Sequence, residues 1–501
     1  MKPNHIRLIS LISGIILFDF LFYRQAPGMN ALLFVPILFS LVRLSGRSAF
    51  SSRENRFAAG GMLAAGLAVA LYGSVFSVFA YIGAFLLYLG FVLEPQLRLI
   101  LTAMPGAALN FLFAPAKMFS DLAASLALKN TMPRLMKLSK LLIIPLLVLF
   151  VFTTIYRFSN PLFNEGFLGL DRFFQAFTAW LGQYLSFGHI VFLLFTGILV
   201  CGIIYKGNKF MFLPVEAGYT DELIRRKSRI PGYRHVQRKV NALRDEYRMG
   251  IMLFALLNLL LLLVNITEVF WLKSGYTGAP ARAMSQNLHE GTVLLIFSIF
   301  LSILVLLTFF RKNLNFYPGN RWLVTGAIAW IAQNGIMALN VGMRNWFYIS
   351  HYGLTYKRIG VLFFLLLVIA GLVLLFIKIR QKKSIFYLLR SNAWSFYILF
   401  ILFSLINWDQ LITSFNLRTS PVKSLDRELL MRQPYRTLKL RDENRDKICP
   451  DPAGADSTAK KQLDNQISQF INRQQSMDWQ SFNLCDRLVY RYFKKKAGTP
   501  E

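Results

Sequence analysis

Long uninterrupted apolar runs are the strongest pattern along this chain. The segments Gly250–Leu272 and Ile359–Ile379 hold few charges and show no alternation of apolar and polar residues. At about 1.5 Å per helical residue, each is long enough to cross a hydrocarbon layer of about 30 Å. The pattern therefore predicts membrane-spanning helices and argues against the alternating strands of an outer-membrane barrel.

Hydropathy along the whole chain predicts eleven spans. The candidates are Leu8–Tyr23, Met29–Val42, Phe57–Gly73, Val75–Leu93, Leu141–Tyr156, Phe187–Tyr205, Gly250–Leu272, Gly291–Phe310, Trp322–Gly342, Ile359–Ile377 and Ala393–Leu411. Residues 99–113 contain Pro105 and are followed by Pro115, so we expect them to be interfacial or re-entrant and not spanning. The first run lacks a small-x-small cleavage site, which predicts an uncleaved first helix.

The predicted fold class is therefore an all-α, polytopic transmembrane helix bundle over residues 1–411. The remaining residues, 412–501, are polar and are expected to form a small, partly ordered C-terminal appendage. The chain of 501 residues is 55% hydrophobic and only 16% charged, which fits the membrane class and not an ordinary soluble core.

The net charge of +31 also fits a membrane protein, because Lys and Arg collect in the cytoplasmic loops of such proteins. No nucleic-acid partner is expected. With the N-terminus inside, the predicted cytoplasmic loops are richer in Lys and Arg than the outer loops. This topology predicts a cytoplasmic N-terminus and a tail outside the cytoplasm, in which Cys449 and Cys485 could form a disulfide.

The cytoplasmic segment 206–249 is densely basic. Val236, Val240, Leu243 and Tyr247 follow at spacings of four, three and four, which places them on one helix face. We expect residues 225–248 to contact anionic lipid, and a docking helix for a cytoplasmic partner is the alternative.

Catalytic signatures are absent from the sequence. There is no phosphate-binding loop, nucleophile elbow, zinc-binding His-Glu-x-x-His helix or Cys-x-x-Cys pair, and the five histidines are scattered. No metal or cofactor is therefore predicted, and a non-enzymatic role is favoured without excluding an enzyme.

Polar residues inside two of the spans have matched spacing. Asn258 and Asn265 lie seven residues apart with Glu268 three further on, and Gln333 and Asn340 repeat the spacing of seven. Small residues recur through the span that holds Gln333, which allows a neighbouring backbone to come close. The spacing predicts that these two helices share a polar seam.

Charged and polar residues also terminate the later spans on the predicted outer side, where intramembrane ionisable groups mark candidate binding sites. The proposed set comprises Asn265, Glu268, His289, Glu290, Asn340, Arg344, Tyr352, Thr355, Lys357, Arg358, Asn407 and Asp409. Asp19 and His189 are expected toward the same side. In the stretch "HYGLTYKR", Lys357 and Arg358 are candidate cations for Glu268, Glu290 or Asp409. Simple anchoring and helix pairing is the structural alternative to a binding site.

Four stretches carry a resemblance to a known family: "RDEYRMGIMLFALLNLLLL", "HYGLTYKRIG", "INWDQLITSFNL" and "DWQSFNL". They resemble bacterial multi-pass membrane proteins known as domain of unknown function 4173, with the close relative 4153. The resemblance runs from about Arg244 through the tail. It implies the same architecture in the bacterial cytoplasmic membrane, with the C-terminal tail in the periplasm. It implies no activity, substrate or cofactor.

The leading functional hypothesis is a membrane protein that binds a polar solute, lipid head group or partner protein through the outer-face cluster, in a transport-like or signalling role. The main alternative is an enzyme for lipid-linked or envelope substrates, with Glu268, His289, Asp409 and Arg358 in its site. A third reading is a scaffold whose tail docks a periplasmic protein.

Overall fold

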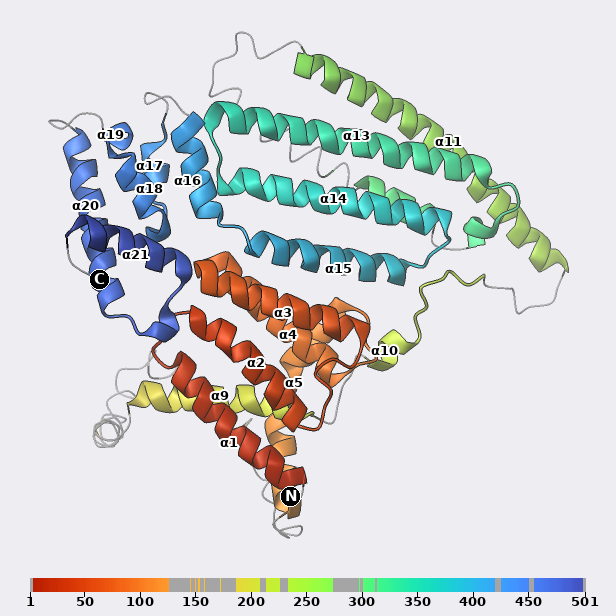
Figure 1. Ribbon diagram of the computed structural model, residues 1–501. Helices are drawn as coiled ribbons and strands as arrows, with labels where there is room; N and C mark the ends of the chain where they lie inside the picture. Colours follow the sequence, from red (N-terminus) through yellow and green to blue (C-terminus); the bar gives the residue numbers. More distant parts are fainter. Residues whose placement is uncertain are drawn as a thin grey trace. The chain divides into compact units, whose positions relative to one another are not determined.

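The computed structural model describes residues 3–125, 186–207, 213–225, 233–273, 301–310, 313–419, 425–449 and 455–498, with a few isolated positions between them. The described residues are helical and contain no strand beyond a single bridge between Glu222 and Lys383. This confirms the all-α prediction. The chain forms two compact units (Figure 1). One comprises Met1–Leu97, Thr102–Leu213 and Met477–Asn483, and the other comprises Arg98–Leu101, Pro214–Ser476 and Leu484–Glu501.

The first unit is a group of packed apolar helices. Its elements are α1 (Pro3–Phe22), α2 (Met29–Leu44), α3 (Arg53–Tyr72), α4 (Val75–Leu93), most of α5 (Ile100–Ser125) and α9 (Phe187–Ile204). Small side chains such as Ala58, Ala65 and Ala68 are fully buried in α3, which packs closely on α2 and α4. Ser52 and Ser74 cap α3 and α4 by accepting backbone N–H groups at their first turns.

The helix α5 covers the segment that was expected to be interfacial or re-entrant. Pro105 and Pro115 lie inside a continuous helix of 26 residues, so the segment does not form a re-entrant turn. Proline is tolerated inside membrane-protein helices because neighbouring groups satisfy the freed carbonyls. The helix is not among those that are both long and apolar enough to be candidate spans, as predicted for this segment.

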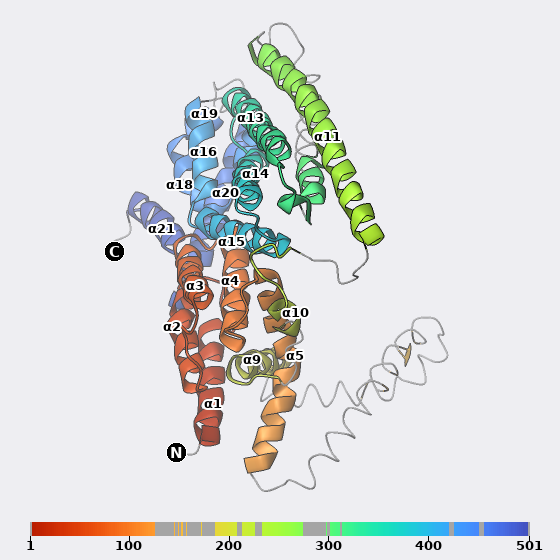
Figure 2. The same ribbon diagram turned by 90° about the vertical axis from the view of Figure 1, so that its right-hand side faces the viewer.

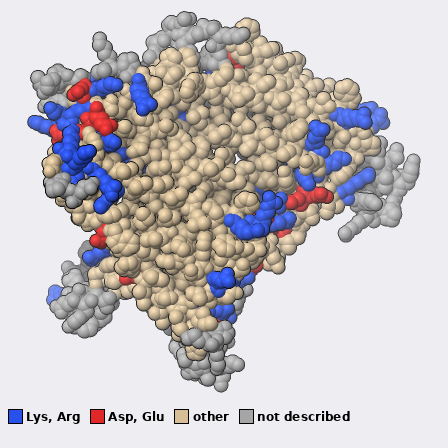
Figure 3. Space-filling view, viewed as in Figure 1, with Lys and Arg blue, Asp and Glu red and all other residues tan. Residues whose placement is uncertain are grey.

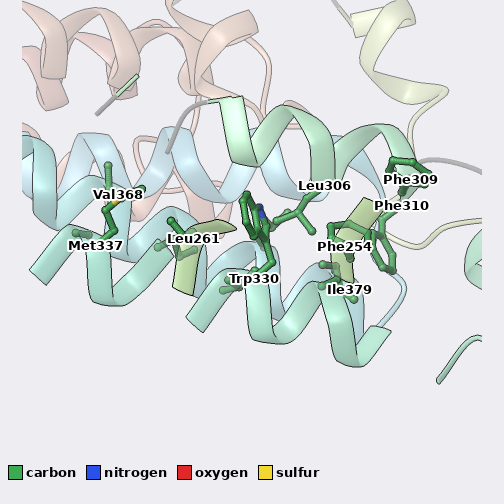
Figure 4. Packing of buried hydrophobic residues seen from close by; sticks show 14 of the residues in the cluster. Phe254, Leu261, Leu306, Phe309, Phe310, Trp330, Met337, Val368 and Ile379 are labelled. Atoms are coloured by element: carbon green, nitrogen blue, oxygen red, sulfur yellow. The ribbon is translucent and has the colours of Figure 1, made fainter. Parts of the chain in front are cut away.

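The second unit contains four long helices packed in the order α11, α13, α14, α15 (Figure 2). They are α11 (Tyr233–Lys273), α13 (Arg321–Tyr352), α14 (Tyr356–Arg380) and α15 (Ile385–Ser404). The core contains Phe254, Leu306, Phe310 and Leu375, with the Trp330 ring pointing toward Leu306 (Figure 4). Residues later in α11 contact residues later in α13, so these two helices run parallel.

Seven described helices are long and apolar enough to cross a membrane. They are His5–Phe22, Val75–Leu93, Phe187–Ile204, Ala242–Phe270, Arg321–Tyr352, Tyr356–Arg380 and Ile385–Ser404. Each corresponds to one of the predicted spans, and Met29–Leu44 is a shorter apolar helix. The predicted span Leu141–Tyr156 lies largely outside the described residues, and of Gly291–Phe310 the structure describes mainly the second half, 301–310. The predicted span Phe57–Gly73 corresponds to α3, which is not among the seven. The total of eleven therefore stays a prediction.

The last predicted span, Ala393–Leu411, had the wrong limits. The helix begins at Ile385, where Ser384 accepts the Tyr387 N–H, and it ends at Ser404. Arg390 and Asn392 in its first half lowered the hydropathy that set the predicted start. A new helix, α16 (Trp408–Thr419), follows after a short break.

The predicted amphipathic segment before α11 is also different. It is the first part of α11 itself, which continues into the candidate span without interruption. Leu243 and Tyr247 pack against the core of the second unit, and the Tyr247 hydroxyl donates to the Gly319 carbonyl at 2.9 Å. These two side chains therefore face protein, while the side chains of Val236 and Val240 lie outside the described set.

The described residues after Leu411 form a packed group of helices. After α16 come α17 (Arg427–Met431), α18 (Leu438–Glu443), α19 (Arg445–Ile448), α20 (Ala455–Gln475) and α21 (Leu484–Lys496). Leu430, Leu438, Leu463, Phe470 and Val489 are buried in their shared core. These C-terminal residues are therefore more ordered than the partly ordered appendage that their polar composition predicted.

Charged side chains are sparse over α13 and α14 on the face seen in Figure 3, and they gather toward the two ends of these helices. Such a distribution is that of a lipid-facing surface between two polar faces.

Candidate functional site

The parallel helices α11 and α13 share a row of polar contacts. Asn258 Nδ2 donates to the Gly326 carbonyl at 2.9 Å, and its Oδ1 accepts Gln333 Nε2 at 2.8 Å. One step along, Asn265 Nδ2 donates to the Gln333 carbonyl at 3.2 Å. The polar seam expected from the spacing of seven is therefore present.

Glycine at position 326 permits this approach. A Cβ added there would lie 3.2 Å from the Phe254 Cβ on α11, tighter than ordinary van der Waals contact. The small residue lets the Gly326 carbonyl come within reach of Asn258. The local sequence thus provides both the polar groups and the space that brings them together.

The seam ends in an ion pair. Arg344 Nη2 lies 2.5 Å from Glu268 Oε2, and their side chains are only 10% and 13% exposed. Removing two such charges from water is costly, and their attraction offsets this cost only when the geometry is good. Breaking a buried pair from one side leaves an uncompensated charge, so this pair holds α11 and α13 in register.

Several buried polar atoms along the same two helices have no hydrogen-bond partner among the residues that the structure describes. They are Asn265 Oδ1, Trp330 Nε1, Gln333 Oε1, Asn334 Oδ1 and Asn340 Nδ2. Asn340 is 4% exposed and Asn334 is fully buried. Each such atom costs about 1–3 kcal/mol relative to a satisfied one. Most buried polar groups in native proteins are paired, so a cluster of exceptions in one seam is unusual.

The hinge between α13 and α14 is held by α16. The Leu354 N–H donates to Asn416 Oδ1 at 2.6 Å, and Asn416 Nδ2 donates back to the Leu354 carbonyl at 2.9 Å. Gly353 adopts a φ of +79° beside this clamp. One side chain thus satisfies both backbone groups of a buried turn residue.

Arg358 has partners other than those expected. It donates to the carbonyls of Tyr352, at 2.9 Å, and of Gly353, and its guanidinium lies 5.6 Å from the Tyr348 ring centre. The prediction that Lys357 or Arg358 pairs with Glu268 or Asp409 was wrong for the described residues, because those carboxylates pair with Arg344 and Arg436. Thr355 stands at the N-cap of α14, and Lys357 and Tyr352 are exposed.

Asp409 pairs with Arg436, whose Nε lies 3.2 Å from its Oδ2. Burial raises the pKa of Asp409, which the charge of Arg436 partly opposes. Next to this pair, Asn407 accepts the Gln410 N–H at the start of α16. The pair and its neighbours connect α16 to the helices of the C-terminal group.

No disulfide joins Cys449 to Cys485 in the structure. The Cys485 sulfur accepts instead from Asn407 Nδ2 at 3.2 Å and from Gln410 Nε2 at 3.3 Å. Burial raises the pKa of the Cys485 thiol. A protonated, hydrogen-bonded thiol reacts poorly, so Cys485 serves packing in this state.

The proposed site residues thus fall into three groups at one end of the second unit. Asn265, Glu268, Asn340 and Arg344 form the end of the seam, Tyr352, Thr355, Lys357 and Arg358 surround the hinge, and Asn407 and Asp409 lie at the start of α16. His289 and Glu290 lie outside the described residues. The described members of the alternative enzyme site, Glu268, Asp409 and Arg358, have separate partners.

In the first unit, Asp19 and His189 pair directly, with His189 Nε2 2.9 Å from Asp19 Oδ1. The Tyr23 ring stacks on the imidazole, and its hydroxyl lies 2.9 Å from Ser186 Oγ. Within the described residues, no group of three or more His, Cys, Asp or Glu side chains is placed to hold a metal ion.

Sequence reasoning missed Asn416 and Arg436. Asn416 acts on a backbone 62 residues away, and Arg436 reaches a carboxylate 27 residues away, so no local pattern marks either one. The only signal was that Asn416 lies in a stretch that carries the family resemblance.

A comparison with protein-family models places part of this chain in a known family. Residues 57–439 match the model of a family described as "Domain of unknown function (DUF4153)". No curated protein and no solved structure matches the chain. The matched region includes α11, α13, α14, α15 and α16, and therefore all the described candidate site residues.

Proposed function

This chain belongs to the family of domain of unknown function 4153, and because that description names no activity, we propose a function from the seam between α11 and α13. The protein is a multi-pass membrane protein that binds a small zwitterionic solute or head group at the end of this seam, in a transport-like role. The observation that carries the proposal is the run of buried polar atoms without partners that ends at the Glu268–Arg344 pair.

The two helices present opposite chemistry to the seam. On α13, Asn340 and Arg344 lie one turn apart, with an unpartnered amide N–H on the first and a guanidinium on the second. On α11, Asn265 and Glu268 lie about one turn apart, with an unpartnered carbonyl oxygen and a carboxylate. A carboxylate or phosphate of the ligand would bind α13, and its ammonium group would bind α11.

The depth of the seam supports a transport-like role. From Asn258 to Glu268 the polar contacts extend over about 15 Å of helix. Polar groups at this depth are rare in membrane helices unless they contact one another, water or a transported solute.

We also propose the orientation. The end with Glu268, Arg344 and α16 faces the periplasm, and the N-terminus lies in the cytoplasm of a bacterial cell. The opposite end of the second unit supports this, because Arg390 and Lys383 there pair with Asp221 and Glu222 within a basic region. Docking of a periplasmic protein on the C-terminal helices and anionic-lipid contact by residues 225–248 stay proposals of the same kind.

Thermal unfolding of the purified full-length protein tests the binding proposal. In phosphatidylglycerol nanodiscs, whose head groups carry no ammonium group, glycine or phosphoethanolamine should raise the unfolding midpoint with concentration, because a ligand that binds only the folded state stabilises it. Acetate and methylammonium at the same concentration should not. Nanodiscs that contain phosphatidylethanolamine distinguish a membrane head group from a free solute. If the ligand is a head group, this lipid alone should raise the midpoint; if the ligand is a free solute, only the added solute should raise it.

Two matched variants separate binding from stability. Asn340→Leu should abolish the shift, yet unfold at the same or a higher temperature without ligand, because it removes an unpartnered amide at similar volume. Asn258→Leu removes an amide that is fully bonded, so it should lower the midpoint and keep the ligand-induced shift. If neither zwitterion shifts the wild-type midpoint, or if the shift survives Asn340→Leu, the proposed function is wrong.

A further inference from the structure

The C-terminal helices expose very few large apolar side chains. Among the described residues after Leu411, the exposed large hydrophobic side chains are Trp479, Leu484 and Leu488. They are 48%, 51% and 52% exposed and lie within ten residues of one another. Scattered exposed hydrophobics are ordinary on soluble surfaces, but a concentration on one short segment marks an interaction surface.

Helix α21 carries two of the three on a single stripe. Leu484, Leu488, Arg491 and Lys495 follow one another at spacings of four, three and four, and all are exposed. The opposite face, with Cys485, Val489 and Phe493, is buried in the C-terminal core. The exposed stripe is therefore apolar in its first half and basic in its second half.

Two independent contacts place the start of this segment at the ends of candidate spans. In the second unit, the Cys485 sulfur accepts from Asn407, three residues after the last residue of α15. In the first unit, the Trp479 ring centre lies 6.3 Å from that of Phe20, which is 58% exposed near the end of α1. Tryptophan beside an exposed phenylalanine at a span end is typical of the membrane–water interface.

The charge of α21 indicates which kind of surface this helix binds. Arg487, Arg491, Lys494, Lys495 and Lys496 stand against a single acidic residue, Asp486, in this helix. An apolar stripe continued by basic residues matches a bilayer surface that contains anionic phospholipid.

We propose that α21 is an interfacial lipid-binding helix. Leu484 and Leu488 enter the boundary between head groups and acyl chains, and Arg491 and Lys495 contact the phosphates of anionic phospholipids. The helix thereby seats the C-terminal group on the membrane face next to the ends of the spans. This inference does not depend on the solute site proposed above.

Fluorescence of a polarity-sensitive label tests the contact in the full-length protein. We would attach the label NBD at Leu488→Cys in a Cys449→Ser background, because the remaining native cysteines, Cys201 and Cys485, are buried. The fluorescence of the Cys449→Ser protein without Leu488→Cys, treated with the same label, would be subtracted as background. In liposomes of phosphatidylcholine with phosphatidylglycerol, the emission should shift to shorter wavelength and should be quenched at least two-fold by nitroxide-labelled lipid. Gln462→Cys, exposed on α20, is the control that should show neither effect.

Lipid composition tests the charge contribution. Liposomes without phosphatidylglycerol should give weaker quenching at position 488, and adding Arg491→Gln and Lys495→Gln should remove the difference between the two lipid mixtures. Quenching equal to that of the Gln462 control in both mixtures would overturn the proposal. Quenching that does not depend on phosphatidylglycerol would overturn the anionic-lipid assignment. A shift of the emission to shorter wavelength without quenching would indicate a protein partner instead.

Discussion

At the scale of single residues, the hinge stretch at 351–358 shows how local chemistry is decided by remote neighbours. Gly353 has a φ of +79°, a conformation that side chains with a Cβ rarely adopt. A Cβ there would lie 2.5 Å from Asn416 Oδ1, the atom that accepts the Leu354 N–H. Glycine is therefore needed both for the turn and for the clamp.

Replacing this glycine should destabilise the protein. Gly353→Ala combines the unfavourable φ with the contact to Asn416, so we expect a loss of about 1–3 kcal/mol in the free energy of unfolding. Gly360→Ala is the matched control, because a Cβ at this position on α14 meets nothing within 4 Å. Alanine is the better helix former, so the control should be neutral or about 0.5–1 kcal/mol more stable. Thermal unfolding in detergent measures both, and equal midpoints for Gly353→Ala and wild type would contradict the clamp.

At the scale of elements, Asp442 connects α18 to α21. Its carboxylate accepts from Lys496 Nζ at 2.6 Å, the Tyr492 hydroxyl at 2.9 Å and Arg445 Nη2 at 2.9 Å. Burial by itself would raise the pKa of Asp442, but these donors together hold that pKa below its usual value. Burial and the nearby carboxylate raise the pKa of Tyr492 to about 12. Ionised Asp442 is thus the form that stabilises the packing of α21.

The pH dependence of stability follows from this direction. A carboxyl whose pKa is lower in the folded than in the unfolded state contributes stability above the unfolded value of about 3.9, and loses it as pH falls through the folded value. We expect Asp442→Asn to cost about 1–3 kcal/mol at pH 7 and to flatten the pH dependence below pH 4. Unfolding midpoints measured between pH 7 and pH 3 would show this, whereas a variant with the wild-type slope would exclude Asp442 as the responsible group.

At the scale of the whole molecule, the ends of the spans carry different chemistry. In the second unit, the ends of α11, α13 and α15 and the start of α14 lie at one end (Figure 1). The turn between α14 and α15, with Lys382, Lys383 and the paired Arg390, lies at the other. If charge sets the orientation, the second end is cytoplasmic and the solute site faces the periplasm.

Labelling of single cysteines tests this orientation. In spheroplasts, a membrane-impermeant maleimide should label Gln462→Cys, exposed on α20, but should label Arg225→Cys, exposed before α11, only after the membrane is opened. The Cys449→Ser background removes the one native cysteine that is not buried. Labelling in the reverse order would place the seam end, α16 and the C-terminal helices in the cytoplasm.

Much of the architecture could be predicted because it depends on local properties of the chain. The length and apolarity of a segment such as Ile359–Ile377 determine whether it can cross a bilayer, whatever surrounds it. The spacing of seven between Asn258 and Asn265, and between Gln333 and Asn340, likewise determines which residues share a helix face. The four stretches quoted from the sequence indicated domain of unknown function 4173 with 4153 as its relative, and the family model that matches is that of the relative, 4153.

Only the tertiary structure decided which polar groups meet. Arg358 has aromatic rings and backbone carbonyls as partners, Asp409 has Arg436, and Asn416 holds the hinge. The sequence by itself determined the helices and their polar faces, because periodicity and hydropathy act within one segment. Pairing between segments depends instead on how the packed helices bring distant residues within hydrogen-bonding distance, and the unpartnered amides of the α11–α13 seam emerge only at that level.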